Sequence, residues 1–122
     1  LRYLHIINRS DFILDFHEGW GFHKIHPSSV GSGVYPNGYG NSTKLSKKIV
    51  KHINYTISKS DHIFIAKPLS DIKGSLKNYT QENKIPYILV ETSGQNNILP
   101  LSTRKKQIDI IIKTIFQEMK LL

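Results

Sequence analysis

The chain has 122 residues, of which 39% are hydrophobic and none is cysteine. This composition fits one globular domain or part of one, and it excludes a disulfide framework and any Cys-ligated metal site. The formal charge of +8 would suit nucleic acid as a partner, but the basic residues are not interleaved with aromatic ones as in single-strand binders, so we do not favour that partner. No stretch reaches the roughly 18 apolar residues of a membrane-spanning helix, so we expect no membrane partner.

The first third of the chain predicts one strand followed by a long loop. Residues 1–8 form a short apolar segment, and Arg9 and Asp11 interrupt it too early for a signal peptide. Residues 11–17 are rich in aromatic and β-branched side chains and predict a strand. Residues 19–41 contain six glycines and two prolines and predict an irregular loop. Loops of this length in compact domains are usually functional or disordered.

The rest of the chain alternates between helical and strand patterns. The first helix has four lysines on the face opposite Leu45, Ile49 and Ile53, as an exposed amphipathic helix would. Serine or threonine at the start of each helical pattern predicts a side-chain N-cap, at Ser42 or Thr43, Ser75 and Ser102. In chain order we expect a helix over 43–58, a strand over 62–66, a helix over 75–83, a strand over 86–91 and a helix over 102–122.

This alternation predicts an α/β fold, with a mainly parallel sheet flanked by helices. In such sheets ligands bind beyond the carboxyl ends of the strands. Two polar clusters follow predicted strands there, residues 15–19 and residues 91–95. We therefore expect the residues that carry chemistry to lie in these two clusters.

The first cluster contains a candidate metal ligand. Side chains alternate along a strand, so Asp15 and His17 project to one face and Glu18 to the other. His17 at a strand end is well placed to bind a metal, with Asp15 as a second-shell acceptor that orients the imidazole. The alternative is that His17 only forms a hydrogen bond at the sheet edge. His23 and His26, in the loop that follows, match no closed zinc signature and are more simply incidental.

The second cluster contains a candidate general base. Glu91 ends an apolar strand, and a carboxylate that emerges from a buried strand is costly unless it is paired or used. Beside a bound metal it would accept a proton and pass it to a leaving amine. The alternative is an ordinary strand-end carboxylate that caps a turn.

Together these motifs resemble a superfamily, the zinc carboxypeptidases and the succinylglutamate desuccinylase/aspartoacylase deacylases. Asp15-Phe16-His17 matches its Asp-x-His strand, and the strand from Pro86 to Glu91-Thr92 matches the one that carries its catalytic glutamate. Gly74-Ser75-Leu76 and the Pro100-Leu101 to Arg104 segment are similar to its flanking helices. The resemblance covers most of residues 11–118, with 74 positions between His17 and Glu91.

The resemblance implies a function and a set of roles. His17 would bind Zn²⁺ together with ligands from an earlier His-x-x-Glu segment, and catalytic Glu91 would carry the proton. The bond cut would be an amide near a free carboxylate, in a peptide tail, a muropeptide or an N-acyl amino acid. Tyr35 would line the pocket mouth, and Arg104 would either meet the substrate carboxylate or make a structural contact.

The chain departs from the family pattern at the zinc site. No His-x-x-Glu occurs in the 122 residues, and one imidazole does not hold zinc usefully. We therefore expect residues 1–122 to be a single, incomplete domain whose upstream half is required for activity. The alternative is a non-catalytic, ligand-binding remnant of the same fold. The sequence predicts no compartment.

Overall fold

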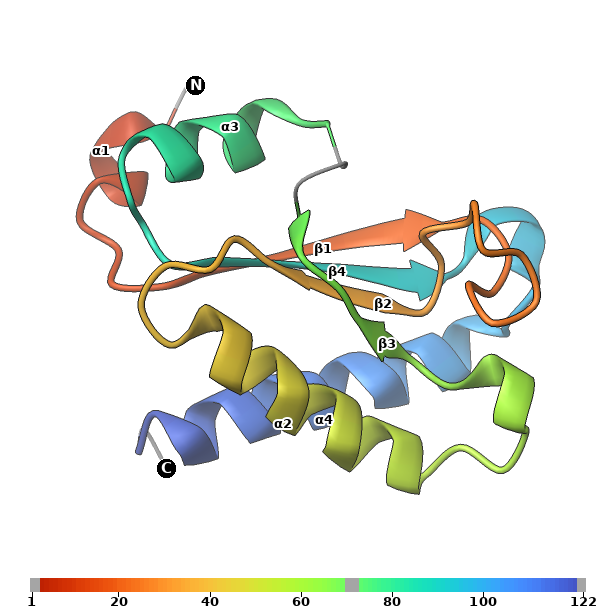
Figure 1. Ribbon diagram of the computed structural model, residues 1–122. Coiled ribbons are helices and arrows are strands. Elements are labelled where there is room, and N and C mark those ends of the chain that lie inside the picture. Colours follow the sequence, from red (N-terminus) through yellow and green to blue (C-terminus); the bar gives the residue numbers. More distant parts are fainter. Residues whose placement is uncertain (1–2, 70–72, 121–122) are drawn as a thin grey trace.

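A computed structural model describes residues 3–69 and 73–120 of the chain. Its β-sheet lies between two helical layers (Figure 1). The helices α2 (Ser42–Tyr55) and α4 (Leu101–Glu118) cover one face, and α1 (Leu4–Ile7) and α3 (Ser75–Glu82) lie on the other. The predicted α/β fold, with helices flanking a sheet, is confirmed.

The sheet has four strands in the order β1-β4-β2-β3. They are β1 (Ile13–Gly19), β2 (Gly33–Pro36), β3 (Ile65–Ala66) and β4 (Tyr87–Ser93). The β1–β4 and β2–β3 pairs are parallel, whereas β2 and β4 are antiparallel. Two of the three pairings are therefore parallel, as a mainly parallel sheet requires, and the carboxyl ends of β1 and β4 meet at one edge.

The two faces of the sheet bury different cores. The face covered by α2 and α4 holds the larger one, in which Leu45, Ile49 and Ile53 of α2 are buried as their helical spacing predicts. The opposite face holds a smaller core of two aromatic and two aliphatic side chains, Tyr35, Leu69, Tyr87 and Leu89. Because side chains alternate along β4, Tyr87, Leu89 and Glu91 all lie on this second face.

The structure corrects two strand predictions. The predicted loop over 19–41 contains β2, which is buried along its whole length. The predicted strand over 62–66 is a strand only at Ile65–Ala66, and His62 instead ends a short 3-10 helix, η1 (Ser60–His62). The strand is short because, among the described residues, β3 pairs only with Gly33 and Val34 of β2.

The predicted N-caps are also wrong. The capping positions of α2, α3 and α4 are Asn41, Gly74 and Pro100, and none of these described residues makes a side-chain capping bond. Ser42 instead accepts a hydrogen bond from the Gly38 N–H at 3.0 Å, because its hydroxyl turns back to the preceding loop. Ser75 and Ser102 lie inside the first turns of their helices.

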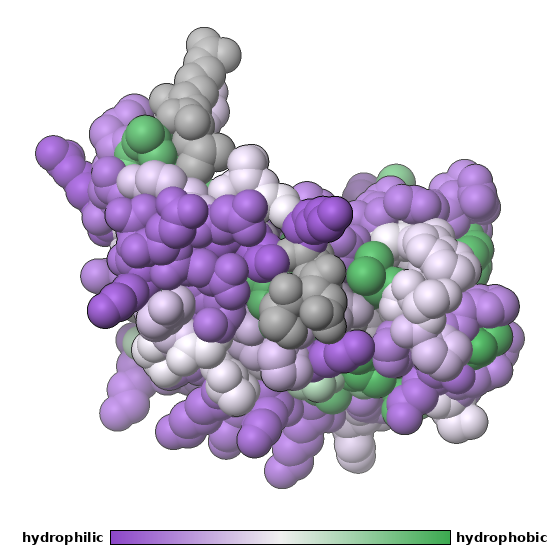
Figure 2. Space-filling view, turned by 45° about the horizontal axis from the view of Figure 1, so that its top comes forward, coloured by the Kyte–Doolittle hydropathy of each residue, from purple (hydrophilic) through white to green (hydrophobic). Residues whose placement is uncertain are grey.

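The surface is mainly hydrophilic where α1 and α3 face the viewer, with small separate hydrophobic patches (Figure 2). Across residues 3–69 and 73–120, no helix combines the length and apolarity that crossing a bilayer requires.

Candidate functional site

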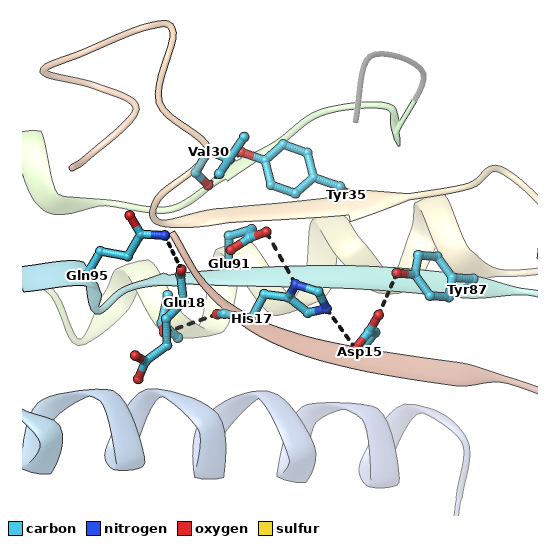
Figure 3. A network of polar contacts seen from close by, with 9 residues as sticks. Asp15, His17, Glu18, Val30, Tyr35, Tyr87, Glu91 and Gln95 are labelled. Atoms are coloured by element: carbon cyan, nitrogen blue, oxygen red, sulfur yellow. Dashed lines mark hydrogen bonds and ion pairs between the residues drawn. The ribbon is translucent and has the colours of Figure 1, made fainter. Parts of the chain in front are cut away.

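The two predicted polar clusters lie side by side at the carboxyl ends of β1 and β4. The parallel register pairs His17 with Glu91 and Asp15 with Leu89, so Asp15, His17 and Glu91 share the face opposite α2 and α4. Figure 3 shows the His17 imidazole between the Asp15 and Glu91 carboxylates. The structure therefore brings together three residues that the sequence singled out separately.

Contacts within this cluster place the imidazole of His17 between two carboxylates. Asp15 Oδ1 lies 3.2 Å from His17 Nε2, and His17 Nδ1 lies 4.0 Å from Glu91 Oε1. The His17 side chain is 54% exposed, whereas that of Glu91 is 10% exposed. The imidazole therefore faces solvent at the mouth of the site, and the Glu91 carboxylate lies at its base.

Burial raises the pKa of the Glu91 carboxyl above its ordinary value. Desolvation raises the pKa of Glu91, the electrostatic interaction with His17 lowers it by a smaller amount, and the interaction with Asp15 raises it again. A carboxyl with a raised pKa accepts and returns protons closer to neutral pH than an exposed one. This electrostatic setting suits a general base.

Tyr35 lies near Glu91 but is itself enclosed. Its side chain is 2% exposed, and its hydroxyl donates to the Val30 carbonyl at 2.8 Å. The phenol ring lies over Gly33, where any side chain would overlap the ring. Burial, and secondarily the charge of Glu91, raise the pKa of Tyr35, so its hydroxyl keeps its proton. Tyr35 is thus a buried neighbour of Glu91 with little surface open to solvent.

Arg104 lies away from the cluster, in contact with the opposite side of β1. Its side chain forms an ion pair with Glu18, and its Nε donates to the Leu99 carbonyl at 3.1 Å. Nη2 also donates to Asn97 Oδ1 at 3.3 Å, and the residue is 5% exposed. Arg104 therefore joins the end of β1 to the start of α4, as the structural alternative expects.

We expect Arg104→Lys to destabilise the chain by about 1 kcal/mol, because an ammonium group cannot hold the same set of acceptors as a planar guanidinium. Urea unfolding monitored by circular dichroism measures the loss, with Lys105→Arg on the exposed side of α4 as the control. Equal unfolding midpoints for Arg104→Lys and wild type would contradict the structural role.

The loop histidines are engaged elsewhere. His23 Nδ1 lies 2.9 Å from the Ser29 carbonyl, and His26 packs against Trp20 with ring centroids 5.6 Å apart. Phe22 is buried and stacks on His62 with ring centroids 3.9 Å apart, so it anchors the loop.

The cluster offers a metal one imidazole. Asp15 beside Nε2 favours a proton on that nitrogen, which leaves Nδ1 with its lone pair towards Glu91, the arrangement of a carboxylate-oriented metal ligand. Among residues 3–69 and 73–120, no group of three or more His, Cys, Asp or Glu side chains has the geometry to hold a metal ion. His17 is the one imidazole of this cluster, so its assignment as a zinc ligand stays a prediction.

Solved structures share this architecture. The apo form of the cell shape determinant protein Csd4 from Helicobacter pylori superposes with a TM-score of 0.74, at 16% identity over 92% of this chain. The fold is that of one part of Csd4. The mDAP-bound form of Csd4, a D,L-carboxypeptidase, gives 0.71 at 14% identity over 91%, and the tripeptide-bound form gives 0.70 at 15% identity over 91%.

The chain spans 31% of each of these Csd4 chains. At such identities the likeness to Csd4 shows the fold alone. No family model matches the sequence, and no curated protein matches it either.

Sequence reasoning missed one polar member of the cluster, Tyr87. Its hydroxyl donates to Asp15 Oδ2 at 2.8 Å (Figure 3). Tyr87 begins an apolar strand and so looks like a core residue. The available signal was the period of two, which places it on the same face as Glu91.

Proposed function

We propose that this chain is part of a carboxypeptidase- or deacylase-type hydrolase, to which it contributes the general base Glu91 and one zinc ligand, His17. The observation that carries the proposal is the position of Glu91. Its buried carboxylate lies 4.0 Å from His17 Nδ1, where the carboxyl ends of two parallel strands meet. The Csd4-like fold supports the same class of enzyme.

Each residue has a role that its surroundings support. Glu91 takes a proton from the attacking water and returns it to the leaving nitrogen, which its raised pKa favours. Asp15 orients the His17 imidazole so that Nδ1 is the ligand atom. Zn²⁺, when bound by His17 and further ligands, would polarise the scissile carbonyl. Tyr35 walls the site beside Glu91.

We propose a small peptide or acyl-amino-acid substrate whose scissile amide lies near a free carboxylate, such as a peptide tail, a muropeptide or an N-acyl amino acid. The tripeptide- and mDAP-bound forms of Csd4 support the peptide class. We do not extend the substrate site to Arg104, because Glu18 already neutralises its guanidinium.

We also propose that residues 1–122 are one incomplete domain. In the described part of the chain β1 pairs with β4 alone, so its other edge is free. Beside that edge a groove of about 550 Å³ is lined by apolar side chains that include Phe12, Phe16 and Phe116. A strand from the rest of the domain would cover this groove. Its carboxyl end would lie beside His17, where further zinc ligands are needed.

The zinc affinity of the chain tests this assignment. Because one imidazole is a weak site, we expect the 122-residue chain to bind zinc weakly. The zinc affinity of His17→Ala should be at least tenfold lower than that of wild type. Isothermal titration calorimetry measures both, and His26→Ala should match wild type. Tight one-to-one binding that His17→Ala abolishes would show a complete site within this chain. That result would overturn the incomplete-domain proposal.

Hydrolysis by the completed domain tests the function. With its upstream half present, the domain should hydrolyse a tripeptide, and a chelator should abolish that activity. The lack of a three-residue metal cluster in the described chain favours one alternative, a non-catalytic module. That module would bind the tripeptide without cleaving it, and a chelator would not affect the binding.

A further inference from the structure

Four side chains form a continuous series on one face of the sheet. Tyr87 OH donates to Asp15 Oδ2 at 2.8 Å, Asp15 Oδ1 lies 3.2 Å from His17 Nε2, and His17 Nδ1 lies 4.0 Å from Glu91 Oε1. The series joins β4 to β1 and returns to β4 (Figure 3). Each of the two Asp15 oxygens therefore has its own partner.

The contact between Tyr87 and Asp15 serves both groups. The Tyr87 side chain is 2% exposed, and a buried hydroxyl needs an acceptor. Burial and the hydrogen bond to Asp15 raise the pKa of Tyr87, so its hydroxyl keeps the proton that it donates. The Asp15 side chain is 21% exposed, and the last torsion of an aspartate is broad. One fixed oxygen therefore decides where the other points.

We propose that Tyr87 is a positioning residue, whose hydroxyl holds Asp15 so that Asp15 meets His17 Nε2 and leaves His17 Nδ1 free to bind metal beside Glu91. Tyr87 itself touches none of the reacting atoms. The metal-binding role of His17 rests on the proposed function. The effect of Tyr87 on the orientation of the His17 imidazole is independent of it, because that effect is a property of the metal-free chain.

Tyr35 provides a matched comparison. It is also 2% exposed, belongs to the same small core and donates one hydrogen bond of 2.8 Å. Its acceptor, however, is the Val30 carbonyl. Removing either hydroxyl deletes one buried hydrogen bond, but only the Tyr87 hydroxyl acts on His17 through Asp15.

The test is the tautomer of the His17 imidazole in the metal-free chain, read from long-range ¹H–¹⁵N correlations at alkaline pH, where imidazoles are neutral. In wild type we expect the Nε2–H tautomer to dominate. Tyr87→Phe should lower the ratio of Nε2–H to Nδ1–H about fivefold, as the loss of one hydrogen bond implies. Asp15→Ala removes the carboxylate itself and should lower the ratio at least as far. Tyr35→Phe should keep the wild-type ratio.

A folded Tyr87→Phe chain that keeps the wild-type ratio, while Asp15→Ala changes it, would overturn the proposal and leave Tyr87 a core residue. If Tyr87→Phe does not fold, the ratio of Nε2–H to Nδ1–H in wild type is compared with that in Asp15→Ala, because a free imidazole already prefers Nε2–H. Equal ratios would overturn the arrangement, and a higher ratio in wild type supports it. Failure of zinc binding or hydrolysis would refute the proposed function without altering these ratios.

Discussion

Glu91→Gln should lower the rate of amide hydrolysis by the completed domain by about 10²–10⁴-fold, because an amide has nearly the same shape as the carboxylate but cannot accept the proton. Zinc should stay bound, since Glu91 is not assigned as a ligand. The turnover of a tripeptide and the zinc content of the purified variant measure the two effects. Glu82→Gln, which changes an exposed carboxylate of α3, is the control. Retained activity in Glu91→Gln would remove Glu91 from the mechanism.

The same substitution should stabilise the isolated 122-residue chain. Because the pKa of Glu91 is raised in the folded state, that state holds a proton at pH values where the unfolded chain has lost it. The stabilisation from this proton is fully present below the unfolded pKa and is lost as pH rises through the folded pKa. Above the folded pKa of Glu91 wild type carries the cost of a buried charge, which Gln removes.

We expect Glu91→Gln to raise the free energy of unfolding by about 1 kcal/mol at pH 7. The difference from wild type should shrink as the pH falls towards 4, where both side chains are neutral in the folded chain. Urea unfolding at several pH values measures it. A variant less stable than wild type at pH 7 would show that the charged carboxylate is favourably paired.

Gly31→Ala is the second substitution for which we expect a large effect, a loss of about 3 kcal/mol of folding stability. A Cβ atom at Gly31 would overlap the Gly21 carbonyl and lie 2.6 Å from that of Trp20 and 2.9 Å from Ser93 Oγ. Two of these neighbours are backbone, so the loop itself must move. The movement would displace the start of β2, where Gly33 pairs with Glu91.

Thermal and urea unfolding measure the cost of Gly31→Ala, and Gly74→Ala is the matched control. Among the described residues a Cβ at Gly74 would meet only Lys77 Cβ, at 3.8 Å, an ordinary contact, so that variant should unfold close to wild type. Similar stabilities for the two variants would mean that the loop accommodates a methyl group next to the site.

The strands with a clear pattern were predictable from sequence. Residues of β1 and β4 form apolar runs with charged residues at their ends, and the period of two correctly separated Asp15 and His17 from Glu18. β2 was not predictable, because its four residues begin with glycine and end with proline, which are loop signals. Its burial comes from pairing with β4, a tertiary contact without a local signature.

The polar site was also predictable only in part. His17 and Glu91 were singled out by their places at strand ends, and the parallel register makes them neighbours. Arg104 has no local feature that distinguishes a substrate contact from an ion pair. Only the fold shows Glu18 beside it. Tyr87 was missed because a tyrosine in an apolar strand gives no sign of which hydrogen bond its hydroxyl makes.

The pairing of β1 with β4 also bears on how the site assembles in time. Every register pair between them, from Ile13 with Tyr87 to Gly19 with Ser93, joins positions 74 residues apart. Closing so long a segment is entropically costly, and non-local strand pairing slows folding. We therefore expect His17 to meet Glu91 late in folding. Because β1 pairs with one strand only in the part of the chain that the structure describes, its fraying would separate the two residues before the remaining sheet opens.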